Sequence, residues 1–303
     1  AAAIANTETP VDSQASLTSE QIARYWSDGF LTIDGVFSPE EVADLRAAAA
    51  ASDIAQAQAQ QGADAQTVHL LGLTSRHPAF HALARDPRII RLLAPLMGPD
   101  IQLQHSKLAT KPLTKGRGAF AWHQDFAYYP HTNTDLLAVM VMLDDATPDN
   151  GCMRMVRGSH RLGMLEHRIN GFFSGGCTET SRWADPASVV DITPKAGGIS
   201  IHHCLTLHGS DVNHSGLPRR GVVYSYRADD AYQLGDDVFD DTGLVVAGVR
   251  RGVVRCENAR FLLPLSNSPH RPNVFGTAWN QQGKRAEAFN SQHAPVVQPS
   301  EMP

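Results

Sequence analysis

One stretch, Gly197-Gly198-Ile199-Ser200-Ile201-His202-His203-Cys204-Leu205-Thr206-Leu207-His208-Gly209-Ser210, carries a clear strand pattern together with metal-binding side chains. Apolar residues alternate with polar ones, which is typical of a half-buried β-strand. By this alternation His202 and His208 share one face of the strand. Similar short segments, separated by Gly, Pro, Asn and Asp, occur at 101–109, 119–126, 136–143, 152–156, 189–192, 199–207 and 221–227. Together they predict a mainly β fold, a sandwich or a barrel.

The residues before this β region predict flanking helices over about 17–98. Thr18-Ser19-Glu20-Gln21 and Ser38-Pro39-Glu40-Glu41 both have the capping-box pattern that opens a helix. Gly29 to Gly35 alternates like a strand, and Asp86-Pro87 opens a helix that ends at Met97-Gly98-Pro99. The Ala/Gln-rich segment 56–66 is predicted to be loop-like or marginally helical.

We therefore expect a single domain over 17–285, in which the helices precede a β core over about 101–229. A C-terminal extension over about 230–285 follows the core. Residues 1–16 and 286–303 are expected to be flexible tails.

Composition excludes several classes of protein. The chain has 303 residues, 42% hydrophobic and 19% charged, which is ample for a core and excludes disorder as the main state. Its net charge of −5 offers no general attraction to nucleic acid or anionic lipid. No apolar run is long enough to span a membrane. Four widely spaced cysteines favour a reducing compartment. We expect a cytoplasmic monomer or homodimer that acts on a small molecule.

A candidate metal site combines two distant segments. His123 and Asp125 stand two apart in Trp122-His123-Gln124-Asp125-Phe126 and would share one face of an extended strand. Such a triplet alone is weak evidence, because it commonly occurs as an ordinary surface or core pair. A third ligand at His208 would complete two histidines and one carboxylate, the arrangement of non-haem Fe(II) oxygenases. If 209–218 form a hairpin, Arg219 returns close to His208, where its guanidinium could bind a carboxylate.

At these residues the chain resembles the phytanoyl-CoA dioxygenase family of Fe(II)/2-oxoglutarate oxygenases. The resemblance runs from about Leu17 to Asp229. It is carried by the following ordered motifs: Leu17-Thr18-Ser19-Glu20-Gln21, Asp28-Gly29-Phe30, Leu96-Met97-Gly98-Pro99-Asp100, His123-Gln124-Asp125, Tyr128-Tyr129-Pro130, Asn150-Gly151-Cys152, Gly158-Ser159-His160, His208-Gly209-Ser210, Asn213 and Arg219.

The resemblance implies a double-stranded β-helix, a cupin-like jelly roll, with helices packed on one side. It implies that His123, Asp125 and His208 bind Fe(II). Arg219 would bind the distal carboxylate of 2-oxoglutarate, with Ser210 as a second contact. Dioxygen would be the other cosubstrate, with succinate and CO2 as co-products. Because related halogenases have a small residue in place of the carboxylate, Asp125 favours oxygenation.

The residues around the site leave several interpretations open. Three of the five lysines, Lys107, Lys111 and Lys115, precede the metal strand. They form either a solvated strand and loop or a basic rim for an anionic substrate, for which Lys107 is the best candidate. Phe126 and Tyr128 line the substrate pocket or pack in the core. His202 has a structural role beside the metal or contacts substrate.

The predicted function is hydroxylation of an unactivated C–H bond of a small metabolite or natural-product intermediate. Phytanoyl-CoA hydroxylases carry a tryptophan in the strand after the His-x-Asp motif, where this chain has Val141 or Met142. This departure, with the balanced charge, disfavours an acyl-CoA 2-hydroxylase. The same residues are also compatible with a catalytically silent jelly-roll binding protein or with a zinc hydrolase. A hydrolase would leave Arg219 and Ser210 without a role. Desaturation, ring closure and epimerisation stay open as outcomes of the oxidation.

Overall fold

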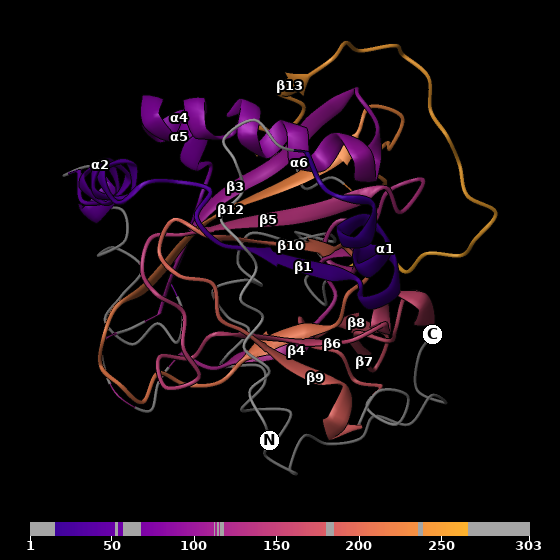
Figure 1. The fold of residues 1–303 in the computed structure, drawn as a ribbon. Coiled ribbons are helices and arrows are strands. Elements are labelled where there is room, and N and C mark those ends of the chain that lie inside the picture. The colour runs from indigo at the N-terminus through magenta and orange to yellow at the C-terminus, as the bar shows by residue number, and fades with distance from the viewer. Residues whose placement is uncertain are drawn as a thin grey trace.

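The computed structural model describes residues 16–51, 54–56, 68–111, 113, 115, 118–179, 185–235 and 239–265. Within these residues two β-sheets face each other, and helices cover the outer face of the larger one (Figure 1). This is the predicted jelly roll with helices on one side. The segments 1–15 and 266–303, which include the end of the predicted C-terminal extension, and most of the Ala/Gln-rich segment lie outside the described residues.

The larger sheet has seven strands. Its order is β1 (Phe30–Ile33), β10 (Ile199–His203), β5 (Leu136–Met142), β12 (Arg219–Ala228), β3 (Ile101–Lys111) and β13 (Val245–Ala247), and β2 (Val68–Leu71) also pairs with β3. The smaller sheet has the order β4 (Phe120–His123), β11 (His208–Ser210), β6 (Met153–Val156) and β9 (Val189–Ile192). β7 (Arg168–Ile169) and β8 (Phe172–Phe173) form a separate hairpin. The described residues also contain the short 3-10 helices η1 (Asp125–Ala127), η2 (Ser159–Leu162) and η3 (Pro186–Ser188).

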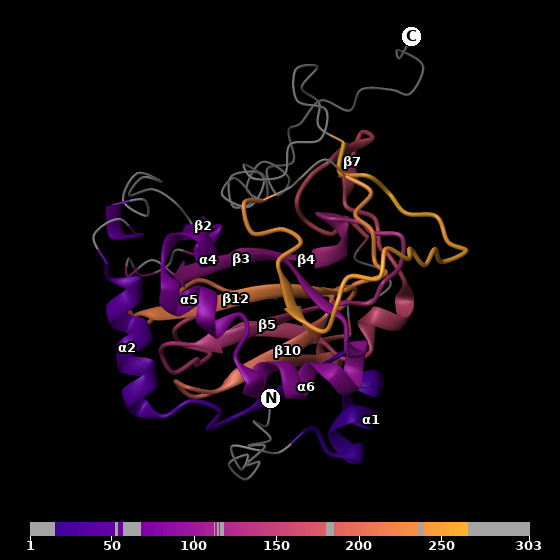
Figure 2. The same cartoon turned by 90° about the horizontal axis from the view of Figure 1, so that it is seen from above.

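The helices begin where their capping residues predict. α1 (Ser19–Asp28) and α2 (Pro39–Ala49) each have a complete capping box, on Thr18 and Ser38 respectively. α4 (Leu73–Arg76) and α5 (Pro78–Leu83) are short, and α6 (Pro87–Met97) is capped by the Asp86 side chain. In the view from above, α2, α5, α6 and α1 lie along one side of the large sheet (Figure 2). No helix in the described part of the chain combines the length and apolar character that crossing a bilayer requires.

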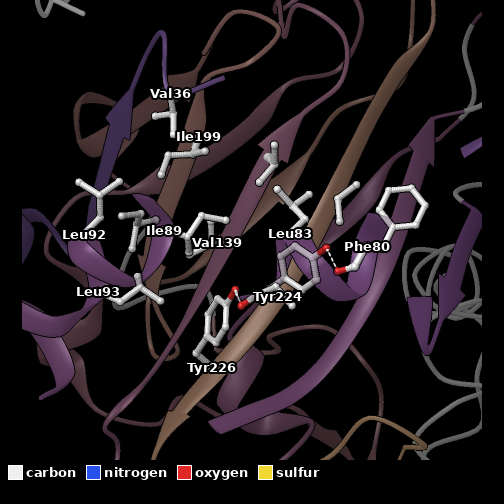
Figure 3. Close-up of a cluster of buried hydrophobic side chains, with 14 of the residues drawn as sticks. Val36, Phe80, Leu83, Ile89, Leu92, Leu93, Val139, Ile199, Tyr224 and Tyr226 are labelled. Carbon is white, nitrogen blue, oxygen red and sulfur yellow. Dashed lines mark hydrogen bonds between the residues drawn. The ribbon is translucent and has the colours of Figure 1, made fainter. Parts of the chain in front are cut away.

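The main hydrophobic core lies between these helices and the large sheet. Outward-facing side chains of the sheet, such as Val139, Ile199 and Tyr224, pack against Leu83, Ile89 and the rest of one cluster (Figure 3). Two buried tyrosines also bond to the helical layer. The Tyr224 hydroxyl donates to the Phe80 carbonyl at 2.7 Å, and Tyr226 donates to that of Ala84 at 2.9 Å. This layer fixes the sheet against which the site is built.

The predicted strand over 199–207 was wrong in one respect, because it is broken. β10 ends at His203, and β11 begins at His208 in the opposite sheet. The Thr206 amide donates to the His203 carbonyl at 2.8 Å, which turns the chain. The Thr206 hydroxyl also donates to the Gly29 carbonyl at 2.8 Å. The chain therefore crosses between the sheets, and simple alternation does not relate His202 to His208.

Candidate metal and cosubstrate site

Three side chains converge between the two sheets. His123 ends β4, Asp125 begins η1, and His208 begins β11, where it lies directly opposite His123 in the strand register. Asp125 Oδ1 is 3.7 Å from His123 Nε2 and 3.9 Å from His208 Nε2. One ligand atom from each residue lies within 4.8 Å of the others, and all three residues are buried. The structure thus brings together the three residues that the sequence singled out, although the strand stops before Asp125.

A glycine allows the two strands to meet closely here. A Cβ atom on Gly209 would lie 2.9 Å from the Phe120 carbonyl oxygen and 3.2 Å from the Trp122 amide nitrogen. Contacts this short require the neighbouring backbone to move. The glycine that follows His208 therefore permits the close strand pairing that places this imidazole beside His123.

Backbone carbonyls orient both imidazoles toward the shared centre. His123 Nδ1 lies 2.8 Å from the Ala121 carbonyl oxygen, and His208 Nδ1 lies 2.9 Å from that of Thr206. A carbonyl only accepts hydrogen bonds, so Nδ1 carries the proton in both rings. The lone pair is then on Nε2, the nitrogen nearer to Asp125. This tautomer is the one that a metal-binding imidazole needs.

The electrostatics of the centre also suit a cation. Burial, with the nearby imidazoles of His123 and His202, holds the pKa of His208 well below 6.5, so the ring is neutral at neutral pH. Burial alone would raise the pKa of Asp125, but the surrounding imidazoles, that of His208 first, hold it well below 3.8. Two neutral imidazoles and one carboxylate form the donor set of non-haem Fe(II) oxygenases, so these residues fit ferrous iron.

A buried arginine faces the same cavity. Arg219 lines it together with the three residues above, and its pKa is lowered to about 10 by burial, so it stays charged at neutral pH. Within the described residues no carboxylate forms an ion pair with Arg219, and its Nε atom has no hydrogen-bond partner. A buried guanidinium without an anion is costly. The cavity is thus suited to receive a carboxylate at this position.

The route by which Arg219 reaches the site differs from the prediction. Residues 209–218 do not form a hairpin, because β11 pairs with β4 and β6, whereas β12 pairs with β3 and β5. Arg219 therefore faces His208 across the space between the sheets. The reason is the jelly-roll topology, in which the chain passes from β10 in the large sheet to β11 in the small sheet and back to β12 in the large sheet. The spacing of the two residues was informative, but the assumed strand pairing was wrong.

Ser210 also lines the cavity, and its neighbour is a lysine that the sequence assigned either to a solvated strand or to a basic rim. Lys111, only 1% exposed, donates from Nζ to Ser210 Oγ at 2.7 Å and to the Asp211 carbonyl at 2.7 Å. Ser210 Oγ accepts in this bond, so its own proton is available to another acceptor. The interpretation of Lys111 as part of a solvated strand was wrong. Its alternation with Lys107 along β3 was the available signal, since both face inward.

The remaining candidates divide into two groups. Lys107 and His202 line the cavity, and both are buried. Phe126 and Tyr128 are not among the lining residues. They belong to a separate cluster, where Phe126 packs against Phe261 and Tyr128 against Phe173, and the Tyr128 ring also lies edge-on to that of His123. The cavity is completed by residues that the sequence did not propose for the site, among them His69, Phe120, Met140 and Met153.

The fold and the site together define a jelly-roll oxygenase of the iron and 2-oxoglutarate class. Comparison with known proteins agrees. The model of the phytanoyl-CoA dioxygenase family matches residues 25–221. A probable alpha-ketoglutarate-dependent hypophosphite dioxygenase of Stutzerimonas stutzeri is 35% identical over 276 residues, covering 85% of this chain and 96% of that protein.

Two solved structures are also similar. The non-heme alpha ketoglutarate dependent carbocyclase SnoK from nogalamycin biosynthesis has a TM-score of 0.64 and 25% identity, covering 76% of this chain and 92% of its own. EctD from S. alaskensis with bound Fe has a TM-score of 0.57 and 26% identity, covering 73% and 80%. The chain belongs to the phytanoyl-CoA dioxygenase family. It is an oxidoreductase that uses iron and 2-oxoglutarate.

Proposed function

We propose that His123, Asp125 and His208 bind Fe(II), that Arg219 and Ser210 bind 2-oxoglutarate, and that the enzyme hydroxylates a small anionic substrate held by Lys107. The single observation that carries this proposal is the placement of all six residues around one cavity, with two buried cations facing the metal-binding centre. Two cations fit two anionic ligands, the cosubstrate and the substrate.

The cosubstrate would be anchored through its distal carboxylate. Arg219 offers a guanidinium that lacks a protein carboxylate, and Ser210 offers a hydroxyl proton directed away from Lys111. Together they supply charge and direction at one end of the cavity. Arg219 Nη2 also lies 3.8 Å from Met140 Sδ, so the apolar wall beside the guanidinium limits access of water to this end.

When bound, the iron and its cosubstrate supply the oxidation of a substrate bond, coupled to decarboxylation of 2-oxoglutarate to succinate and CO2. The residues of the chain position the reactants and exclude water. The two Nδ1–carbonyl bonds keep each imidazole in the ligand tautomer, and burial keeps His208 neutral. Asp125 occupies the carboxylate position, which favours hydroxylation over halogenation.

Lys107 supports a small anion as the substrate. Lys107 is 6% exposed and lines the cavity, and burial lowers its pKa to about 8, with Asp125 opposing that shift. A relative of 35% identity is named for hypophosphite, itself a small anion. This similarity supports a compact anionic substrate over an acyl-CoA.

The test is succinate release by the purified chain with Fe(II) and 2-oxoglutarate. Candidates to be added singly are hypophosphite, a small carboxylate, zwitterionic ectoine and an acyl-CoA. We expect a small anion to give the largest stimulation. Lys107→Met should raise the KM for that anion more than Lys107→Arg does, because the arginine keeps the charge. Stimulation by the acyl-CoA or by ectoine alone would exclude the proposed substrate class.

A further inference from the structure

A third histidine lies beside the proposed metal ligands. His202 is 2% exposed and lines the same cavity, and its ring centroid is 4.5 Å from that of His208. It comes from β10, an interior strand that pairs with β1 on one side and with β5 on the other. Its backbone is therefore held on both sides, whereas Asp125 lies on the short turn η1 outside any strand.

The hydrogen bonding of His202 distinguishes it from the ligands. His202 Nε2 is 3.1 Å from Asp125 Oδ2, whereas Asp125 Oδ1 is the oxygen nearer to His123 and His208. The carboxylate accepts, so Nε2 of His202 carries the proton. In His123 and His208 the proton is instead on Nδ1. The protonated nitrogen of His202 faces the carboxylate, so it is a donor to Asp125.

We infer that His202 is a positioning residue that holds the outer oxygen of Asp125 and thereby presents Oδ1 alone to the metal. This inference rests on the ligand set of the proposed function. A carboxylate with one oxygen engaged elsewhere occupies one metal position, which preserves positions for the cosubstrate and dioxygen. Because His202 is on an interior strand of the large sheet, its bond also ties η1 to that sheet.

The experiment measures equilibrium binding of Co(II), used as a spectroscopic probe, to the full chain without cosubstrate. His202→Leu should weaken Co(II) affinity by about 10–100-fold, the usual effect of removing a partner of a metal ligand. It should also change the ligand-field spectrum. His131→Leu removes another buried imidazole, one that does not line the cavity, and should keep wild-type affinity.

Two further variants keep the test decisive if the leucine variant does not fold. Gln at position 202 places an amide donor where Nε2 stands, whereas the shorter Asn cannot reach it. His202→Gln should therefore bind Co(II) more tightly than His202→Asn. Equal affinities for the two, or wild-type affinity in a folded His202→Leu, would overturn the inference. If the wild-type chain itself bound no stoichiometric Co(II), the proposed ligand set would fail, which is a separate outcome.

Discussion

The two faces of the large sheet are both buried, yet they differ in how their polar groups are satisfied. On the outer face of β12, Tyr224 and Tyr226 donate to helix carbonyls and pack in the main core. On the inner face of the same strand, Arg219 is equally buried but has no carboxylate partner among the described residues. Burial alone therefore does not separate core from site. The difference is whether the protein itself supplies the partner.

The largest effect is expected from His123→Ala on the inner side. Loss of one imidazole should abolish iron-dependent succinate formation while changing the melting temperature little, because the cavity is not part of the main core. The measurements are the rate of succinate release and the amount of iron bound per chain. His81→Ala, on the exposed surface of α5, is the control and should retain activity. Wild-type turnover in the His123 variant would remove this residue from the ligand set.

On the outer face, Leu93→Ala should reverse this pattern. Leu93 is fully buried in the main core, so the void left by the shortened side chain should lower the unfolding free energy by about 2–5 kcal/mol. Turnover of the folded enzyme at low temperature should be unchanged. Urea unfolding measures the loss of unfolding free energy, and succinate release measures turnover. The partly buried Ile90 on the same helix, changed to Ala, should cost less. If Leu93→Ala selectively lowered turnover, the two faces would not be separable.

A smaller change is expected for Arg219→Ala. Losing a charged hydrogen bond of about 1.5–3 kcal/mol should raise the KM for 2-oxoglutarate by about 10–150-fold, with iron affinity nearly intact. The neighbouring Arg220 faces the other way and pairs with Asp144 at 2.8 Å, so Arg220→Ala is a matched control. An unchanged KM in the Arg219 variant would reject the proposed anchor.

The smallest effect concerns pH. The Lys107 amine is protonated, and therefore positively charged, at pH values below its pKa of about 8. Burial holds the pKa values of the neighbouring His69 and His105 low, so these two rings are neutral in this range. The negative charge that acts on Lys107 is that of Asp125. Affinity for an anionic substrate should therefore fall as pH rises through about 8, to roughly a tenth one unit higher. The pH profile of kcat/KM measures this fall. In Lys107→Arg the fall should move to higher pH, and an unmoved fall would assign it to another group.

The sequence predicted the local features well because they depend on neighbouring residues. The capping boxes at Thr18 and Ser38 each involve few residues, and both were confirmed. The strand expected over 136–143 is present as β5, but all of its residues are buried, so the expected half-buried alternation was wrong there. His123 and Asp125 could be paired from the sequence because they stand two residues apart, whereas the distant His208 was reached through the strand pattern and the family resemblance. Strand pairing was not accessible, because alternation assigns a face but not a sheet. The link between β10 and β11, and the burial of Lys111, depend on residues far apart in the chain.

The C-terminal glycine of α1 has a consequence for how the enzyme could be shortened. Gly29 has φ of +90°, and a Cβ there would lie 2.6 Å from the Thr206 hydroxyl oxygen, which bonds its carbonyl. Thr206 in turn accepts from His208 Nδ1 through its own carbonyl. The N-terminal helix is thus a structural support for His208, a proposed iron ligand that lies far from this helix in the sequence. Trimming the enzyme to its β-strands would remove that support, so a minimal catalytic unit must begin before α1.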